Sequence, residues 1–457
     1  MVLWASHALA AGTQADGAAA KQIASVVDPI VEKEIASGVP GAAFVFVRNG
    51  SVVYQRGYGV ADVATQSTVD PERTVWPIAS ITKTVTALGA LQLVADGRIK
   101  LDDDLNRYLK RLQVPAQGYA PLTLRHILSH TGALDELPGR RYDGKQAPDM
   151  AAFLKDKLVR YREPGKLTAY STYGIALAGV LIEDMSGQSY AEYLKQHIFT
   201  PAGMSSARVM LRQGDEKGVA TPYEIDDGRA TAIPYEWYQT PATSSMVATA
   251  TDMGRLLIVH LAEGRAGSNQ LLSPALTRAM HEQQATNHSD LPGWSLGFQL
   301  DNVNGVALVE HGGDIAGFSA LFALMPDKHE GFFIVNHGES SDLRFRLKQA
   351  LLDALYPAKP TSVPALDEKN APALDEYAGR YISSITCRTC PLDDDQVFVV
   401  KAQPNGTLSL WGQTWVPLRR DLFVRDDGKR LLGFARDEKS KIISVTGGSW
   451  RVADRLP

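Results

Sequence analysis

The stretch PIASITKTVTALGALQLVADG (residues 77–97) decides how this chain is interpreted. From Ile81 onward its apolar residues recur every three or four positions, and Gly97 supplies a left-handed stop, a pattern typical of a buried helix. Ser80 lies near the predicted N-terminus and Lys83 follows three residues later, so the two side chains share one face. An amine buried without a partner is energetically costly. Lys83 therefore requires an explanation.

Two interpretations of this Ser-x-x-Lys pair are open. In the first, Ser80 caps the helix and Lys83 extends to the surface. For an isolated pair this is the better interpretation, because about one or two such pairs occur by chance in a chain of average composition. In the second, Ser80 is a nucleophile and Lys83 activates it. The rest of the chain must decide between them.

Length and charge limit the classes of protein to consider. The 457 residues are too many for one ordinary core and predict a large domain with a smaller one. The formal net charge of -4 and the pI near 6.2 show no basic bias, so nucleic acid is not an expected partner. No apolar stretch reaches the roughly 20 residues that a membrane span requires, so we expect no transmembrane segment. The sequence does not indicate an oligomeric state.

Residues 1–20 resemble the end of a secretory signal. They contain a short apolar run followed by Ala8-Leu9-Ala10 as a cleavage site, although the basic leading region is missing. We therefore expect an exported protein, periplasmic or secreted, with a truncated signal sequence. The alternative is a disordered Ala/Gly arm on a cytoplasmic protein.

The chain contains two cysteines, Cys387 and Cys390, in the sequence CRTC. A single CxxC is only half of a zinc site, so we expect no metal and no other cofactor. A loop disulfide, which would be consistent with export, and two idle thiols are both open interpretations.

The order of the predicted elements indicates an α+β fold. A helix over residues 20–37 precedes two strand-like runs around Asn49-Gly50, the strongest short hairpin signal. The region from about 100 to 290 is mostly helical, and strands return at VALVEHGG, FSALFALMP and GFFIVNH before a last helix. We predict an antiparallel sheet flanked by helices, with a mostly helical insertion, over residues 21–356. An active site is expected at the seam between sheet and insertion.

The chain changes character after residue 356. Residues 357–372 are rich in proline, charged and small residues, which predicts a linker. Over residues 373–457, short β-patterned runs alternate with turns such as PNG and RDDGKR. This pattern predicts a small all-β domain, either a barrel or a strongly curled sheet.

Two further motifs follow the Ser-x-x-Lys pair. Tyr170-Ser171-Thr172 lies in a turn that enters a predicted helix, and His311-Gly312-Gly313 lies at the end of a predicted strand. Each motif alone is weak evidence, because a tyrosine is more often a half-buried phenol and His-Gly-Gly is more often a tight turn. In this order after Ser80 and Lys83, the three motifs together are specific.

With these motifs the chain resembles the serine β-lactamase and penicillin-binding protein superfamily. Within it, the chain is similar to the class C β-lactamase-like branch that includes esterases and D-amino-acid peptidases. The supporting stretches include VPGAAFVFVRNG, LTLRHILSHTGAL, TPAGMSSA, ATATDMGRLL and HGGDIAGFSA. The carboxy-terminal domain resembles the lipocalin-like barrel that some members append.

The resemblance implies a role for each motif. Ser80 would be the acylated nucleophile, Lys83 its partner and Tyr170 the base of the second motif. The third motif would be His311-Gly312-Gly313, with the oxyanion between the backbone N–H groups of Ser80 and Asp314. Losing one such donor typically costs about 3 kcal/mol.

The identity of the base stays open at this point. Lowering the pKa of a tyrosine from near 10 to about 7 requires about 4 kcal/mol. One ammonium at roughly 4 Å supplies about that much before desolvation is subtracted. Either Tyr170 or a neutral Lys83 therefore fits.

Two positions depart from the usual superfamily pattern. His311 stands where β-lactamases usually carry the lysine of KTG, and Thr172 replaces the asparagine of YxN. Both changes favour an ester, an amide or a D-peptide as substrate, with at most weak β-lactamase activity. We thus expect a metal-free serine hydrolase with an acyl-enzyme on Ser80. The alternative is a non-catalytic relative that binds penicillin or peptidoglycan fragments.

Other residues have a second interpretation too. Tyr235, Trp237 and Tyr238 in PYEWYQTP fit an acyl pocket, but packing of the helical insertion is the favoured interpretation. His126 and His130 flank a predicted helix end and are interpreted as structural.

Overall fold

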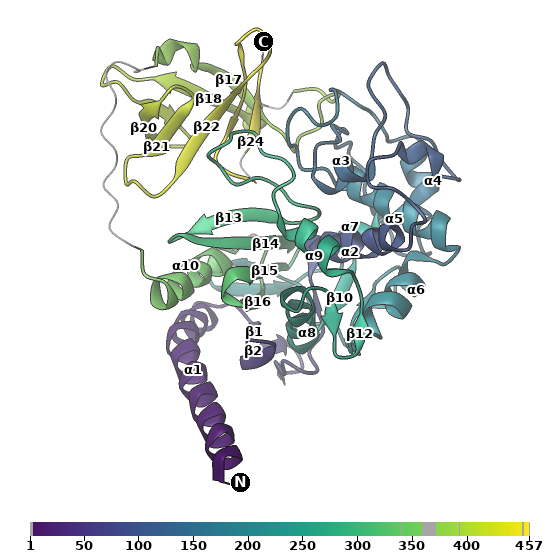
Figure 1. The fold of residues 1–457 in the computed structure, drawn as a ribbon, viewed down its shortest axis with the longest axis vertical. Helices are drawn as coiled ribbons and strands as arrows, with labels where there is room; N and C mark the ends of the chain where they lie inside the picture. Colours follow the sequence, from purple (N-terminus) through teal and green to yellow (C-terminus); the bar gives the residue numbers. More distant parts are fainter. Residues whose placement is uncertain (1–2, 340, 359–371, 393, 450–451, 457) are drawn as a thin grey trace.

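The computed structural model describes residues 3–339, 341–358, 372–392, 394–449 and 452–456. It contains a large α+β part and a carboxy-terminal β-barrel, which Figure 1 places above strand β13 of the large part. Most of the predicted linker, residues 359–371, lies outside the described residues.

The large part is built on a seven-stranded antiparallel sheet with the order β13-β14-β15-β16-β1-β2-β3. Asn49 and Gly50 have positive φ angles of 51° and 79°. These angles close the predicted hairpin between β1 and β2, because type I′ turns require φ above zero at both central residues. The strands are β1 (Gly41–Arg48), β2 (Ser51–Asp62), β3 (Ser67–Thr68), β13 (Gln299–Val303), β14 (Val306–Ile315), β15 (Phe318–Met325) and β16 (Glu330–His337).

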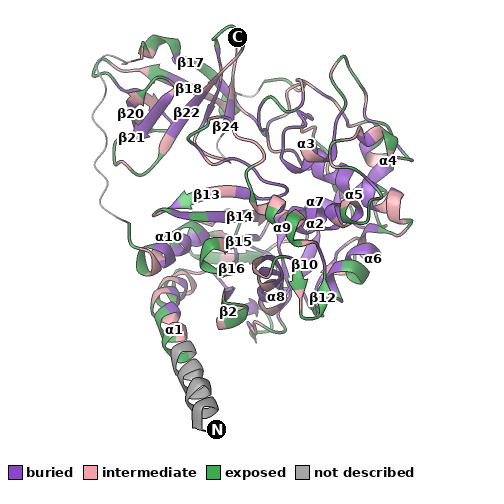
Figure 2. Cartoon of the chain, viewed as in Figure 1, coloured by how far each residue is buried: buried purple, intermediate pink, exposed green. Residues whose placement is uncertain are grey.

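Helices cover both faces of this sheet. On one face, α1 (Leu3–Ala36) and α10 (Leu343–Leu355) pack their apolar side chains onto Phe44 and Phe46 of β1. On the other face, α8 (Ala250–Leu261) packs against β1 and β16. In Figure 2, strand β14 is coloured mainly as buried, whereas α10 also carries exposed segments. Helix α1 begins earlier than predicted, because residues 3–20, expected to be a signal remnant or a disordered arm, belong to it.

The insertion is mostly helical, as predicted, and its two central helices are α2 (Thr82–Ala95) and α5 (Thr172–Ser186). Ser189 forms a capping box with Glu192, and Ser273 is the N-cap of α9, which begins with Pro274. The remaining helices are α3 (Leu124–Leu128), α4 (Met150–Lys155), α6 (Tyr190–Leu194), α7 (Pro241–Ser244) and α9 (Pro274–His281). The short strands are β4 (Trp76–Pro77), β5 (Arg141–Tyr142), β6 (Arg208–Val209), β7 (Tyr223–Asp226), β8 (Arg229–Ala232), β9 (Trp237–Tyr238), β10 (Met246–Ala248), β11 (Arg265–Ala266) and β12 (Asn269–Gln270).

The carboxy-terminal domain is a closed eight-stranded barrel, which confirms the all-β prediction. Its interior is filled by apolar and aromatic side chains that include Tyr377, Tyr381, Phe423 and Phe434. Cys387 and Cys390 form a disulfide in the loop after the first strand. The strands are β17 (Gly379–Ser383), β18 (Val397–Ala402), β19 (Leu408–Leu410), β20 (Gln413–Arg419), β21 (Leu422–Arg425), β22 (Leu431–Arg436), β23 (Ile442–Thr446) and β24 (Val452–Arg455).

Candidate active site

Ser80 lies in a single 3-10 turn, η1 (Ala79–Ile81), that leads directly into helix α2. The N-cap of η1 is Ile78 and the N-cap of α2 is Ile81, and neither residue forms a side-chain hydrogen bond as a cap. The capping interpretation of Ser80 is therefore wrong. The residue before it, Ala79, has a φ of 48°, a conformation that typically costs a non-glycine residue about 1–3 kcal/mol.

Lys83 does not reach the surface, because its side chain is folded back onto Ser80. The residue is 1% exposed, and its Nζ lies 3.0 Å from Ser80 Oγ and 2.9 Å from the carbonyl oxygen of Thr243. Burial lowers the pKa of Lys83 well below its usual value of 10.5, and the charge of Arg140 lowers it further, whereas Glu136 opposes the shift. Burial in low dielectric disfavours the charged form of an amine. The structure thus favours a neutral Lys83, which can accept a proton.

Tyr170 stands directly before helix α5, whose N-cap is Ser171. The motif therefore has the predicted turn-into-helix geometry. The Tyr170 ring centroid lies 5.1 Å from Lys83 Nζ. Burial raises the pKa of Tyr170 above its usual value of 10.0, and a hydrogen bond with Ser80 lowers it by less. The phenol is therefore protonated at neutral pH.

The third motif lies toward the end of strand β14, as the sequence predicts, and not in a tight turn. Strand β13 pairs with β14 only as far as Glu310, so residues 311–315 have β15 as their one strand partner among the described residues. The opposite edge of residues 311–315 lies against the turn that contains Ser80. A Cβ added at Gly313 would stand 2.3 Å from the carbonyl oxygen of Ile78. Only glycine permits this approach.

This edge also carries Asp314. Its carboxylate accepts hydrogen bonds from Arg344 Nη2 at 2.5 Å and from Ser319 Oγ at 2.9 Å. These two bonds fix the end of β14 beside the tip of helix α2. The backbone of Asp314 is thus held near the N–H groups of the helix tip, where an anion is stabilised.

His311 is buried and neutral. Its Nδ1 donates a hydrogen bond to the carbonyl oxygen of Gly312 at 2.7 Å. Burial lowers the pKa of His311 to about 3. His311 therefore brings no positive charge to the place where the KTG lysine of β-lactamases would lie.

Aromatic side chains that sequence reasoning did not assign to the site enclose Tyr170. The ring centroid of His130 lies 4.6 Å from that of Tyr170, and the Trp294 ring lies 4.3 Å from His130 and 5.6 Å from Tyr170. His130 Nδ1 also accepts a hydrogen bond from the N–H of Ser171 at 3.0 Å. His130 thus supports the second motif directly. His126, by contrast, belongs to a helix capping box, which confirms its structural interpretation.

Three residues on one loop were also missed, because a loop carries no periodic signal. Glu136 Oε1 accepts hydrogen bonds from the N–H groups of Thr172 and Tyr173 at 2.6 and 3.3 Å, and Arg140 Nη1 donates to Thr172 Oγ1 at 3.2 Å. Asp135, which is 0% exposed, accepts from the barrel instead. This loop therefore connects the second motif to the barrel.

The barrel contacts arise from the disulfide loop and from the loop after β23. The N–H groups of Arg388 and Thr389 donate to Asp135 at 2.6 and 3.0 Å, and the Thr389 hydroxyl donates at 2.7 Å. Trp294 Nε1 donates to the carbonyl oxygen of Ser449 at 2.9 Å. The barrel thus holds Trp294, whose ring lies beside that of Tyr170, and Asp135, which directly precedes Glu136.

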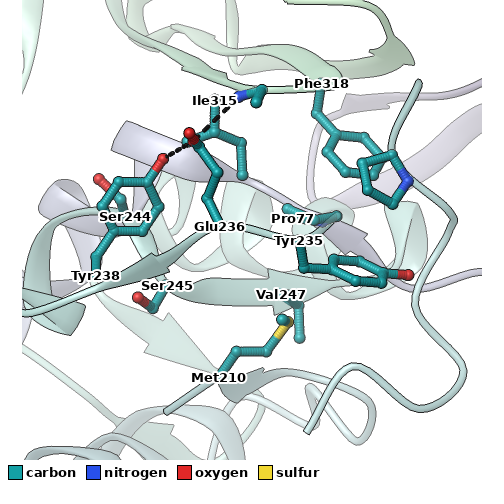
Figure 3. Close-up of a pocket in the computed structure, with 12 residues that line it drawn as sticks. Pro77, Met210, Tyr235, Glu236, Tyr238, Ser244, Ser245, Val247, Ile315 and Phe318 are labelled. Carbon is teal, nitrogen blue, oxygen red and sulfur yellow. Dashed lines mark hydrogen bonds between the residues drawn. The ribbon is translucent and has the colours of Figure 1, made fainter. Parts of the chain in front are cut away.

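A small pocket is lined by residues that are close in sequence to the site: Pro77 lies three positions before Ser80, and Ser244 follows Thr243 (Figure 3). Trp237 belongs to a buried cluster, Tyr235 packs against that cluster and Tyr238 is buried, which agrees with the packing interpretation. Tyr235 and Tyr238 also line this pocket. The Glu236 carboxylate in this pocket is paired with Arg141 Nε at 2.6 Å. The full lining comprises Pro77, Met210, Pro222, Tyr235, Glu236, Tyr238, Ser244, Ser245, Val247, Ile315, Ala316 and Phe318.

Comparison with known proteins gives a consistent result. The family model described as Beta-lactamase matches residues 23–356. The protein flp of Staphylococcus aureus (strain MRSA252) is 25% identical over 322 residues, which cover 68% of this chain and 62% of flp. The chain thus spans less than two thirds of the length of this relative.

Solved structures show the same fold. A structure of SurE with D-Leu superimposes with a TM-score of 0.69 at 22% identity and covers 96% of this chain and 100% of that chain. EstCE1, a hydrolase with promiscuous acyltransferase activity, superimposes with a TM-score of 0.62 at 21% identity and covers 74% of this chain and 99% of that chain. Among the described residues, no helix is both long and apolar enough to span a membrane.

Proposed function

This chain belongs to the beta-lactamase family, and on that premise we propose that it is a serine hydrolase that forms an acyl-enzyme on Ser80 and cleaves an ester or a peptide-like amide. One observation carries the proposal: the buried Nζ of Lys83 lies 3.0 Å from Ser80 Oγ. A serine hydroxyl becomes a good nucleophile when an adjacent base removes its proton.

The proton path follows from the two shifted pKa values. Neutral Lys83 takes the Ser80 proton as Oγ attacks the substrate carbonyl, and the resulting ammonium returns that proton to the leaving group. Tyr170, protonated at neutral pH, forms a hydrogen bond with Ser80. Its hydroxyl relays the proton from the Lys83 ammonium to the leaving group. Water then hydrolyses the ester on Ser80 with the same groups in reversed roles.

The oxyanion of the tetrahedral intermediate would lie between the backbone N–H groups of Ser80 and Asp314. The close approach of Gly313 to Ile78 supports this position, because it holds the edge of β14 against the helix tip. Gly312 belongs to the same edge, and buried, neutral His311 assists by shaping it. Preorganised N–H donors of this kind supply a large share of the catalysis in acyl transfer.

The substrate class is inferred from the walls of the site. The pocket that Pro77 and Ser244 line has mainly apolar and phenolic walls, which suits an uncharged acyl or side-chain group. The activities stated for EstCE1 and the D-Leu bound to SurE support acyl transfer and a D-amino-acid substrate, respectively. A β-lactam is a weaker candidate, because neither His311 nor Thr172 reproduces the groups that β-lactamases use.

A labelling experiment tests the chemistry. A fluorophosphonate or a labelled penicillin should add mass to the peptide that contains Ser80, and Ser80→Ala should abolish both label and turnover. Ser129→Ala, which removes another buried serine hydroxyl, is the matched control and should retain both. Turnover that survives in Ser80→Ala would refute the proposal.

A substrate panel distinguishes the substrate classes. Turnover of p-nitrophenyl esters, D-aminoacyl anilides and a chromogenic cephalosporin should rank esters or anilides above the cephalosporin. A protein that takes no label, turns over nothing and yet binds a D-Ala-D-Ala peptide would instead be a non-catalytic binding protein.

We also propose that the chain is exported. The Cys387–Cys390 disulfide supports this proposal, because disulfides persist in oxidising compartments. Cell fractionation with an antibody tests it, and recovery only in the cytosolic fraction would refute it.

A further inference from the structure

Arg140 is a half-buried cation without a carboxylate partner. Among the described residues, the Arg140 side chain forms one hydrogen bond, from Nη1 to Thr172 Oγ1 at 3.2 Å. No carboxylate oxygen of the described residues lies within 4.0 Å of its guanidinium nitrogens. The neighbouring Arg141 is 69% exposed and is nevertheless paired with Glu236. A guanidinium has five N–H donors, so Arg140 has donors left for a ligand.

The position of Arg140 brings this free charge to the reacting groups. Thr172, its hydrogen-bond partner, is two residues from Tyr170, and the charge of Arg140 acts on both Lys83 and Tyr170. The nearby carboxylate of Glu136 does not neutralise it by contact, because Glu136 accepts from the N–H groups at the start of α5.

The backbone of Arg140 is fixed before any ligand arrives. Its carbonyl oxygen accepts a hydrogen bond from the N–H of Gln239 at 2.7 Å. The next two residues form β5, which pairs with β9, and Tyr238 of β9 lines the same pocket as Pro77 and Ser244. The guanidinium is therefore carried by a segment that also builds the pocket wall, and a preorganised group binds its ligand with less loss of entropy.

We propose that Arg140 binds a carboxylate of the substrate, so that the preferred substrate is an ester or amide with a free carboxylate near the scissile bond. This inference rests on the proposed function and names its substrate class. Arginine recognises carboxylates through two parallel hydrogen bonds. Neutral His311 does not provide the positive charge that the KTG lysine provides in β-lactamases. Arg140, which is bonded to Thr172 of the second motif, provides a positive charge instead.

Two matched substrate pairs test the proposal and separate the two halves of the substrate. The first pair is p-nitrophenyl hemisuccinate and its methyl ester, with the carboxylate in the acyl part. The second is N-acetyl-D-Ala-D-Ala and its carboxamide, with the carboxylate in the leaving part. We expect the wild-type kcat/KM for the acid to exceed that for its neutral partner in one pair. Arg140→Gln should reduce this acid-to-neutral ratio by about tenfold or more.

Arg98→Gln removes the same charge from an exposed position and should leave the ratio unchanged. An unchanged acid-to-neutral ratio in Arg140→Gln, or no preference for the acid in either pair, would overturn the inference. Failure of the proposed function would give a different result, namely neutral-ester turnover that does not depend on Ser80.

Binding of N-acetyl-D-alanine and of monomethyl succinate to the Ser80→Ala protein, measured by calorimetry, gives a readout without turnover. At least one of the two should bind, and Arg140→Gln should weaken it about tenfold. Equal binding by the two proteins also overturns the inference.

Discussion

Lys83 Nζ and Ser80 Oγ lie 3.0 Å apart, and the other hydrogen-bond partner of Nζ is a carbonyl oxygen, that of Thr243. A carbonyl does not stabilise an ammonium as a carboxylate would, so this arrangement keeps the lysine neutral and basic beside the nucleophile. Burial of the amine beside a carbonyl thus has two effects: it costs free energy of folding, and it leaves the amine a lone pair that can accept the Ser80 proton.

Replacing Lys83 by methionine should separate activity from stability. We expect turnover of a p-nitrophenyl ester to fall by about 10²–10⁴-fold, because the base is lost. The free energy of unfolding should rise by about 1 kcal/mol, because an apolar side chain of similar length replaces a buried amine. Urea unfolding and steady-state kinetics measure the two effects, and the exposed Lys155→Met is the control.

The stability difference should depend on pH in a defined direction. The folded-state pKa of Lys83 is lowered, whereas the unfolded chain keeps the usual value of 10.5. Between these two values the unfolded state binds more protons, so the stability of the wild type rises with pH. The advantage of Lys83→Met should therefore shrink as the pH is raised toward 10.5. An advantage that grows with pH would contradict the assignment of a neutral Lys83.

Tyr170→Phe should reduce turnover less than Lys83→Met. The phenol is protonated, so its loss removes a donor and a proton relay but not the base; we expect a decrease of about 10²-fold. The acidic limb of the pH profile of kcat/KM should stay in place, because it belongs to Lys83. Tyr173→Phe, at a neighbouring buried phenol, is the control. Disappearance of the acidic limb in Tyr170→Phe alone would assign the base to Tyr170.

Gly313→Ala should disrupt the contact between β14 and the Ser80 turn. Its Cβ would stand 2.3 Å from the Ile78 carbonyl oxygen, so the strand must move. We expect a loss of about 1–3 kcal/mol in the free energy of unfolding and a slower reaction of Ser80 with a fluorophosphonate. At the adjacent Gly312 the nearest atom would be 3.5 Å away, so Gly312→Ala should change stability by less than about 0.5 kcal/mol. Equal effects of the two substitutions would argue against the close approach.

Asp135→Ala tests the connection between the barrel and the second motif. Three donors of the disulfide loop would lose their acceptor, and an unsatisfied buried donor costs about 1–3 kcal/mol. We expect lower stability and slower labelling of Ser80, because Glu136, the next residue, holds the N-terminus of α5. The exposed Asp156→Ala is the control. If Asp135→Ala labels at the wild-type rate, the barrel does not support the site through this loop.

Much of the fold could be predicted because its signals are local. The Asn49-Gly50 hairpin and the Ser80–Lys83 pair each join residues at most three positions apart. At such separations the geometry of one turn or one helix fixes which side chains meet. The alternation of strands and helices likewise predicted the antiparallel sheet and the barrel.

The third motif shows the limit of local signals. His311-Gly312-Gly313 was predicted at the end of a strand and lies in β14, where it pairs with β15. The sequence around the motif does not indicate, however, that Gly313 lies against the carbonyl oxygen of Ile78. The aromatic residues of PYEWYQTP were equally ambiguous, since packing and pocket-lining aromatic residues have the same pattern in sequence.

By itself, then, the sequence determined the fold class, the order of the two domains and the residues that carry the three motifs. Only the tertiary structure decided that Lys83 is buried beside a carbonyl from residue 243 and that the phenol of Tyr170 keeps its proton. It also decided that Arg140 forms no salt bridge within the described part of the chain. The physical reason is the separation along the chain of the residues that meet at the site. Burial and charge at the site depend on contacts between residues 32 to 254 positions apart, which arise from packing and leave no periodic trace in the chain.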